Sequence, residues 1–166
     1  MTDRRALFKL ASSAGLVAAV STAEAAGEGA TGIFKAGVLN PDKNPLTGPH
    51  AVKLRNVREW LVFAGHSALG RNGEIMHPGS ALDQLRWIFA SLGHTLQQEG
   101  YSLADVVQLK MTCVVDVTLG ERVKFLDVVR EVFGKQSIPP MGATMSVVHA
   151  LMYPGMLVEV DIWAAR

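Results

Sequence analysis

Two amphipathic helices alternating with strands limit this chain to a small set of folds. From residue 81 to 99, apolar side chains recur every three or four positions, which predicts a helix with one apolar face. Ser80 is a suitable N-cap for this helix, and Gly100 is a suitable end. A second helix is expected over residues 121–133, where apolar residues again share one face and Gly134 follows.

Strands are expected before, between and after these helices. Residues 108–116 alternate apolar and polar side chains, a pattern typical of a half-buried strand. Short apolar runs predict a strand over 59–65 and two more, joined by a turn, over 143–150 and 156–164. This order predicts an α+β fold in two layers, with one mixed β-sheet covered on one face by two helices.

The last expected strand has two unlike faces. One face is entirely apolar, whereas the other mixes carboxylates with large apolar groups. The mixed face consists of Leu157, Glu159, Asp161 and Trp163. Such a mixture fits a sheet face that packs against another subunit around a polar pocket.

Residues 1–26 predict an export signal rather than part of a folded domain. Arg4 and Arg5 precede an uncharged run rich in Ala and Ser, and small residues follow where a signal peptidase would cut. The paired arginines resemble a bacterial twin-arginine signal, whereas an amphipathic helix is the plainer alternative. We therefore expect a periplasmic or secreted protein, an N-terminal arm or loop over 27–50, and a domain over 51–166.

Composition and charge exclude several classes of protein. An apolar fraction of 49% and a charged fraction of 19% are typical of a globular chain. A formal net charge of +1 gives no electrostatic basis for binding nucleic acid. The single cysteine, Cys113, cannot close an intramolecular disulfide or form a thiolate zinc site. The apolar run near the N-terminus is too short to anchor the chain in a membrane.

Several stretches, in order along the chain, resemble the YjgF/Rid family of reactive intermediate deaminases. They are LTGPH at 46–50, VFAG at 62–65, GYSLADVVQLKMTCVVD at 100–116, the helix end at 131–133, the turn IPP at 138–140 and LVEVDIWA at 157–164. No single stretch is diagnostic, but the ordered set with this spacing is specific. The resemblance runs from about residue 46 to the last residue.

This resemblance implies a chorismate-mutase-like α+β fold and a homotrimer with pockets between subunits. Members of the family hydrolyse small enamines and imines, such as 2-aminoacrylate, to keto acids and ammonia without metal or organic cofactor. In them an arginine binds the substrate carboxylate, and a glutamate on the last strand positions the attacking water. The expected partners are therefore further copies of the chain and a small-molecule ligand, with no nucleic acid and no stable membrane association.

The resemblance assigns candidate site residues by position. Glu159 matches the catalytic glutamate, and Thr144 stands where the substrate-binding arginine would be. Ser146 replaces a cysteine two residues further on, His50 replaces a tyrosine of the N-terminal loop, and His66 follows the glycine of the second strand. Glu159 is thus the expected catalytic residue, and the other four are expected to contact the substrate.

Thr144 cannot equal an arginine as a ligand for a carboxylate. Arginine donates two charge-assisted hydrogen bonds, whereas threonine offers one neutral hydroxyl. Losing a partly buried pair of this kind costs about 2–5 kcal/mol, so we expect poor activity on 2-aminoacrylate. Either the substrate lacks an α-carboxylate, or another cation binds it. Arg71, in the loop after the second strand, is the first candidate cation, ahead of Arg55 and Arg58.

Three functions are compatible with the sequence. The first is an imine or enamine hydrolase, and the second is a non-catalytic trimer that holds a small ligand in the same pockets. The third, a nuclease, is disfavoured by the near-neutral charge. His50, His66 and Glu159 could form a metal site of two histidines and one carboxylate, but no spacing motif supports it, and we expect no metal.

Overall fold

The computed structural model describes residues 34–38, 51–134 and 141–166 of the chain. The expected export signal at 1–26 and the candidate residue His50 lie outside the described residues. None of the described helices is long and apolar enough to cross a membrane.

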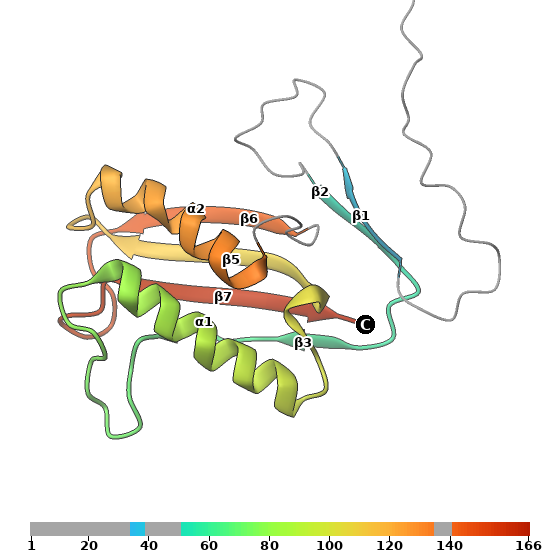
Figure 1. Ribbon diagram of the computed structural model, residues 1–166, viewed down its shortest axis with the longest axis horizontal. Coiled ribbons are helices and arrows are strands. Elements are labelled where there is room, and N and C mark those ends of the chain that lie inside the picture. Colours follow the sequence, from blue (N-terminus) through green and yellow to red (C-terminus); the bar gives the residue numbers. More distant parts are fainter. Residues whose placement is uncertain (1–33, 39–50, 135–140) are drawn as a thin grey trace, which may run out of the picture. The chain divides into compact units, whose positions relative to one another are not determined.

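A five-stranded mixed sheet is the centre of the domain (Figure 1). Its strands are β3 (Trp60–Val62), β4 (His66–Ser67), β5 (Val106–Val114), β6 (Gly142–Val148) and β7 (Val158–Ala165). Strand β7 pairs antiparallel with β3 and β4 along one edge and with β5 along the other. Strand β6 lies at the outside of the sheet and runs parallel to β5.

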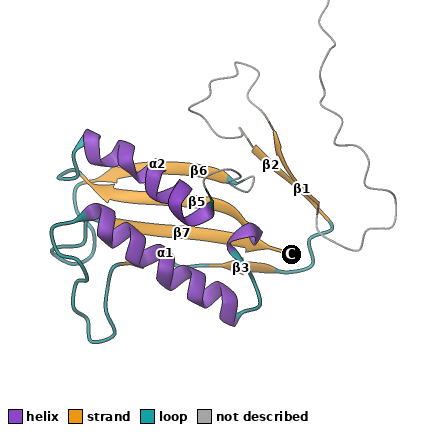
Figure 2. Ribbon diagram, in the orientation of Figure 1, coloured by secondary structure: helices purple, strands orange, loops and turns teal. Residues whose placement is uncertain are grey.

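Two helices cover one face of this sheet, α1 (Ala81–Gln98) and α2 (Leu119–Phe133) (Figure 2). A 3-10 turn, η1 (Leu103–Asp105), leads into β5. The core lies between the helices and the sheet, and its largest fully buried side chains include Phe89, Phe125, Leu92, Leu109 and Ile162. The predicted α+β fold, with two helices on one face of a mixed sheet, is confirmed.

Hydrogen bonds at the helix N-termini explain where both helices begin. The hydroxyl of Ser80 accepts a hydrogen bond from the backbone N–H of Asp83, so the predicted N-cap of α1 is confirmed. Helix α2 begins two residues earlier than expected, because Thr118 and Glu121 form a reciprocal capping box there. These hydrogen bonds lower the pKa of the Glu121 carboxyl.

The structure differs from the sequence prediction in two places and adds the strand order, which the sequence left open. Residues 34–38, within the stretch interpreted as an arm or loop, form strand β1 (Phe34–Val38), which pairs antiparallel with β2 (Ala51–Arg55). The last two strands follow one another in sequence, but β5 lies between them in the sheet. Only Trp60–Val62 of the run 59–65 is a strand, and β4 follows separately.

A fully buried glutamine, Gln84 on α1, ties the loop before β7 to the rest of the domain. Its amide nitrogen donates to the carbonyl oxygens of His77 at 3.4 Å and Gly155 at 2.8 Å. Its amide oxygen accepts from the backbone N–H of Leu157 at 2.9 Å. One side chain thus satisfies three backbone groups, two of which lie just ahead of the strand that carries Glu159.

We expect Gln84→Met to lower the free energy of unfolding by about 2–4 kcal/mol, because buried backbone groups lose their partner. The matched variant Gln98→Met, at an exposed position of the same helix, should change it by less than about 0.5 kcal/mol. Urea unfolding of the three proteins measures both values. Equal effects of the two substitutions would show that Gln84 has no special role in the fold.

Candidate functional site

The sheet face opposite the helices carries the polar side chains of the three longest strands, and we call it the helix-free face. Val158, Val160 and Ile162 of β7 are fully buried on the helix side. Side chains alternate along a strand, so Glu159 and Asp161 point to the opposite face. The face of the last strand that sequence analysis singled out is therefore the face that the helices leave uncovered.

Strand register places four polar side chains in one line across the helix-free face, which we call the Glu159 row. Ser67 of β4 is opposite Glu159 of β7. Glu159 is in turn opposite Thr112 of β5, and Thr112 is beside Ser146 of β6. The carboxylate of Glu159 is thus flanked by the hydroxyl-bearing residues Ser67 and Thr112, and Ser146 lies one strand beyond Thr112.

Two neighbours hold the Glu159 carboxylate in place. The hydroxyl of Ser67 donates a hydrogen bond to Oε2 of Glu159 at 3.3 Å. A Cβ atom added at Gly65 would lie only 2.7 Å from Cδ of Glu159, so glycine leaves the space that this carboxyl group occupies. Glu159 is half-buried rather than free in solvent. Its carboxylate is consequently both positioned and accessible.

A second line of side chains, the Lys110 row, lies next to the first. Lys110 of β5 is beside Thr144 of β6 and opposite Asp161 of β7. Its Nζ atom is 3.9 Å from Oδ2 of Asp161. The Lys110 side chain is 52% exposed and that of Asp161 is 26% exposed. A cation therefore lies directly beside the threonine that replaces the expected arginine.

The structure brings only some of the predicted site residues together. Glu159 and Ser146 share one row, and Thr144 lies exposed in the adjacent row. Arg71 is exposed in the turn after β4, and the described residues show no hydrogen bond or ion pair from it to either row. His66 belongs to the other side of the sheet.

The imidazole of His66 faces helix α1 rather than the Glu159 row. Its Nε2 atom is 3.0 Å from Oγ of Ser91 on that helix. The neighbouring residue, Ser67, points to the helix-free face, as strand alternation requires. Burial lowers the pKa of His66 below 6.5. His66 therefore joins the sheet to α1 in this structure.

This environment predicts a pH-dependent contribution to stability. Below pH of about 6.5 the unfolded chain binds a proton at His66 more readily than the folded chain does, so stability falls as the pH drops through that range. Between about pH 7.5 and pH 5.5, we expect the wild type to lose more unfolding free energy than His66→Gln, whose amide does not titrate. The matched variant His94→Gln, at an exposed position of α1, should behave like the wild type. An identical pH profile for His66→Gln and wild type would contradict this account.

Sequence reasoning missed four residues that shape this face: Gly65, Ser67, Lys110 and Thr112. The polar positions of 108–112 signalled that Lys110 and Thr112 share a face. Their neighbours on β4, β6 and β7 depend on strand register, which alternation alone does not specify. Within the described residues, no group of three or more His, Cys, Asp or Glu side chains is arranged to hold a metal ion.

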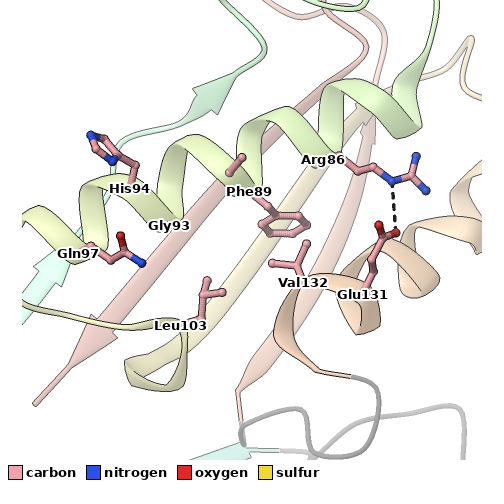
Figure 3. Close-up of a pocket in the computed structure, with 9 residues that line it drawn as sticks. Arg86, Phe89, Gly93, His94, Gln97, Leu103, Glu131 and Val132 are labelled. Atoms are coloured by element: carbon pink, nitrogen blue, oxygen red, sulfur yellow. Dashed lines mark hydrogen bonds and ion pairs between the residues drawn. The ribbon is translucent and has the colours of Figure 1, made fainter.

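A shallow hollow lies in the helix layer, between α1 and α2 (Figure 3). Phe89 and Val132 line it, and Nε of Arg86 donates to Oε2 of Glu131 at 3.3 Å. His94 and Gln97 lie further along α1. None of the predicted site residues lines this hollow, and it is on the side of the sheet away from Glu159.

Comparisons with known proteins agree with this architecture. A family profile described as Endoribonuclease L-PSP matches residues 47–166. The structure of YyfB, a Rid-family protein from Yersinia pestis, is similar with a TM-score of 0.65 and 26% identity, over 78% of this chain and 97% of that one. No curated protein sequence matches.

Two more distant structures share the fold. Rv2704 from Mycobacterium tuberculosis, a member of the YjgF/YER057c/UK114 family, has a TM-score of 0.52 and 24% identity, over 81% of this chain and all 100% of its own. The YjgF gene product of E. coli has a TM-score of 0.54 and 15% identity, over 64% of this chain and 80% of its own. With the profile match over most of its length, this chain belongs to the Endoribonuclease L-PSP family, the YjgF/Rid family that its sequence resembles.

Proposed function

We propose that this protein is a cofactor-independent hydrolase of small imines and enamines, with Glu159 as the residue that positions and deprotonates water. The observation that carries the proposal is the Glu159 row. A half-buried carboxylate, held by Ser67 and backed by Gly65, faces outward between the hydroxyl-bearing residues of β4 and β5. A positioned carboxylate with such neighbours suits general base catalysis.

The chemistry needs only one such group and a bound substrate. An enamine first tautomerises to its imine. Water then adds to the imine carbon as Glu159 accepts one of the water protons and passes it to the imine nitrogen, which gives an adduct with one hydroxyl and one amino group. Glu159 next accepts the hydroxyl proton and passes it to the amino nitrogen while the carbon–nitrogen bond breaks, so that ammonia leaves and the carbonyl forms. One imine and one water thus give one carbonyl compound and one ammonia, and Glu159 ends the cycle deprotonated.

The proposal includes a restriction on the substrate. Thr144 is exposed and offers a single hydroxyl where relatives are expected to have a guanidinium. We therefore propose that 2-aminoacrylate, a minimal carboxylate-bearing enamine, is a poor substrate.

The resemblance of residues 1–26 to an export signal supports action outside the cytoplasm.

We also propose that the site is completed by a second copy within a trimer. The helix-free face exposes an apolar end made of Trp60, Val62 and Trp163, where the two indoles pack edge to face at 6.4 Å. The opposite side of the sheet exposes a different apolar surface. It consists of Leu119, Val123 and Leu126 on α2 with Met145 and Val147 on β6.

Two unlike apolar surfaces on one chain favour a ring. When different surfaces of successive copies meet, the contact is heterologous, and a closed ring satisfies every copy. Large exposed apolar groups also favour burial against protein. The trimer expected from the family resemblance is therefore supported by how the apolar side chains are distributed here.

A non-catalytic small-molecule-binding trimer is the alternative, favoured by the absence of arginine at Thr144. The family description names an endoribonuclease. For this chain an RNA substrate has little electrostatic support, because the two rows contain the carboxylates of Glu159 and Asp161 and only one ammonium, that of Lys110.

We expect Glu159→Gln to abolish ammonia release above the spontaneous rate, because an amide cannot accept the water proton. The substrates are imines generated in situ from a panel of amino acids by an amino acid oxidase. Glu99→Gln, an exposed isosteric change at the end of α1, should keep full activity.

The outcomes separate the two functions. Loss of activity in Glu159→Gln alone supports the hydrolase. No turnover by the wild type on any imine, with equal ligand-induced thermal stabilisation of wild type and Glu159→Gln, would instead establish the binding protein.

A further inference from the structure

We propose that the hollow between α1 and α2 is a second binding site, which takes a small, flat, uncharged molecule with a lactam group. This site is independent of the proposed hydrolase site, because the sheet separates it from Glu159. None of the residues proposed above for contact between copies of the chain lines the hollow.

The size and lining of the hollow suit a small ligand. Its volume is about 580 Å³, which is within the roughly 300–1,000 Å³ of small-molecule sites. Its apolar walls come from both helices and from η1, and they consist of Phe89, Ala90, Val132 and Leu103. Figure 3 shows the Phe89 ring and Val132 between the two helices. Because the hollow is shallow, a flat ring can place one whole face against these side chains.

Gly93 leaves room for close approach of a ligand to α1. It lies in the interior of this helix and lines the hollow, and no left-handed backbone requires glycine there. A Cβ atom added at Gly93 would meet no atom of the described residues within 4 Å, apart from its chain neighbours and its own helix backbone. Glycine is less favourable than alanine inside a helix. Packing among the described residues thus gives no reason for glycine at this position, whereas a ligand in the hollow does.

The ion pair of Arg86 and Glu131 presents a donor and an acceptor side by side at one end of the hollow. Nε of Arg86 donates to Oε2 of Glu131 at 3.3 Å, and Nη1 donates to Oδ1 of Asp83 at 3.0 Å. Among the described residues, neither Nη2 of Arg86 nor Oε1 of Glu131 has a hydrogen-bond partner. A lactam carries its C=O and N–H on the same side, so it can accept from the guanidinium and donate to the carboxylate. A trans peptide group carries them on opposite sides.

The charges at this end favour an uncharged ligand. Arg86 lies between the carboxylates of Asp83 and Glu131. An anionic ligand would meet both carboxylates, and a cationic ligand would compete with the guanidinium that already serves them. Both side chains of the Arg86–Glu131 pair are about half exposed, so the pair strengthens binding only modestly.

The spacing along α1 sets the length of the ligand. Arg86 and Gly93 are seven residues apart on the same face of the helix, which corresponds to two turns and roughly 10 Å. A molecule of two fused rings, with its lactam edge at the Arg86–Glu131 pair, spans most of this distance and covers the apolar walls between them. The structure therefore favours a two-ring heteroaromatic lactam.

The test measures binding of 4-quinazolinone, a two-ring lactam, to the full chain by ligand-observed NMR. Quinazoline, which lacks the lactam group, is the comparison ligand. For so open a site we expect a dissociation constant on the order of 1 mM for 4-quinazolinone and about fivefold weaker binding of quinazoline. Glu131→Ala should remove this preference, and Lys124→Ala, at an exposed position of the same helix, should match the wild type. Equal binding of the two ligands by the wild type, or no binding of the lactam at about 5 mM, would overturn the proposal.

Substitutions of Gly93 test the place of binding. Gly93→Ala should raise the midpoint of thermal unfolding by about 2–4 °C, because the helix gains and no contact is lost. Gly93→Leu should fill the hollow and weaken lactam binding at least about tenfold, whereas Gly120→Leu, at an exposed position of α2, should not. Glu159→Gln should bind the lactam as the wild type does. A lower midpoint for Gly93→Ala, unchanged binding by Gly93→Leu, or loss of binding in Glu159→Gln would each contradict a site in this hollow.

Discussion

The alternation of side chains along β5 and β7 is the constraint on which the rest of the structure depends. Every second residue of β7 is fully buried beneath the helices, from Val158 to Ala164. The residues between them must then face away from the helices, and they include two carboxylates. A one-residue slip of β7 would bury Glu159 in the core and expose its valines, so the packing of the core itself fixes where the polar groups lie.

The register of the strands then brings residues from four separate strands together in the candidate site. Pairing of β4, β7, β5 and β6 lines up Ser67, Glu159, Thr112 and Ser146, although they come from parts of the chain far apart in sequence. The buried hydrogen bonds of Gln84 hold the segment that enters β7. Core packing and site geometry are therefore two consequences of the same strand pairing.

Local patterns predicted the local structure well. Both helices, the cap at Ser80 and the strand predicted over 108–116, which the structure has at Val106–Val114, follow from spacing rules that act within a few residues. Strand β1 was not predicted, because its five residues lie in a stretch rich in glycine and proline. Its hydrogen-bonded pairing with β2 stabilises a strand that its own sequence does not indicate. Likewise, no local signal indicates that β5 separates β6 from β7.

The candidate site was predictable only in part, for the same reason. Glu159 was found through alternation and family resemblance. Lys110 was not, because its position beside Thr144 depends on the pairing of β5 with β6. His66 shows the opposite error, since its position in the sequence suggested the pocket whereas its contact with Ser91 lies on the helix side.

The central claim is that the helix-free face forms a substrate-binding site that is completed by another copy of the chain. Light scattering coupled to size-exclusion chromatography tests it most directly. The account predicts a particle with three times the mass of one chain across a wide range of concentration. A particle with the mass of a single chain would contradict it, because Glu159 would then face open solvent with no neighbouring subunit to enclose a substrate.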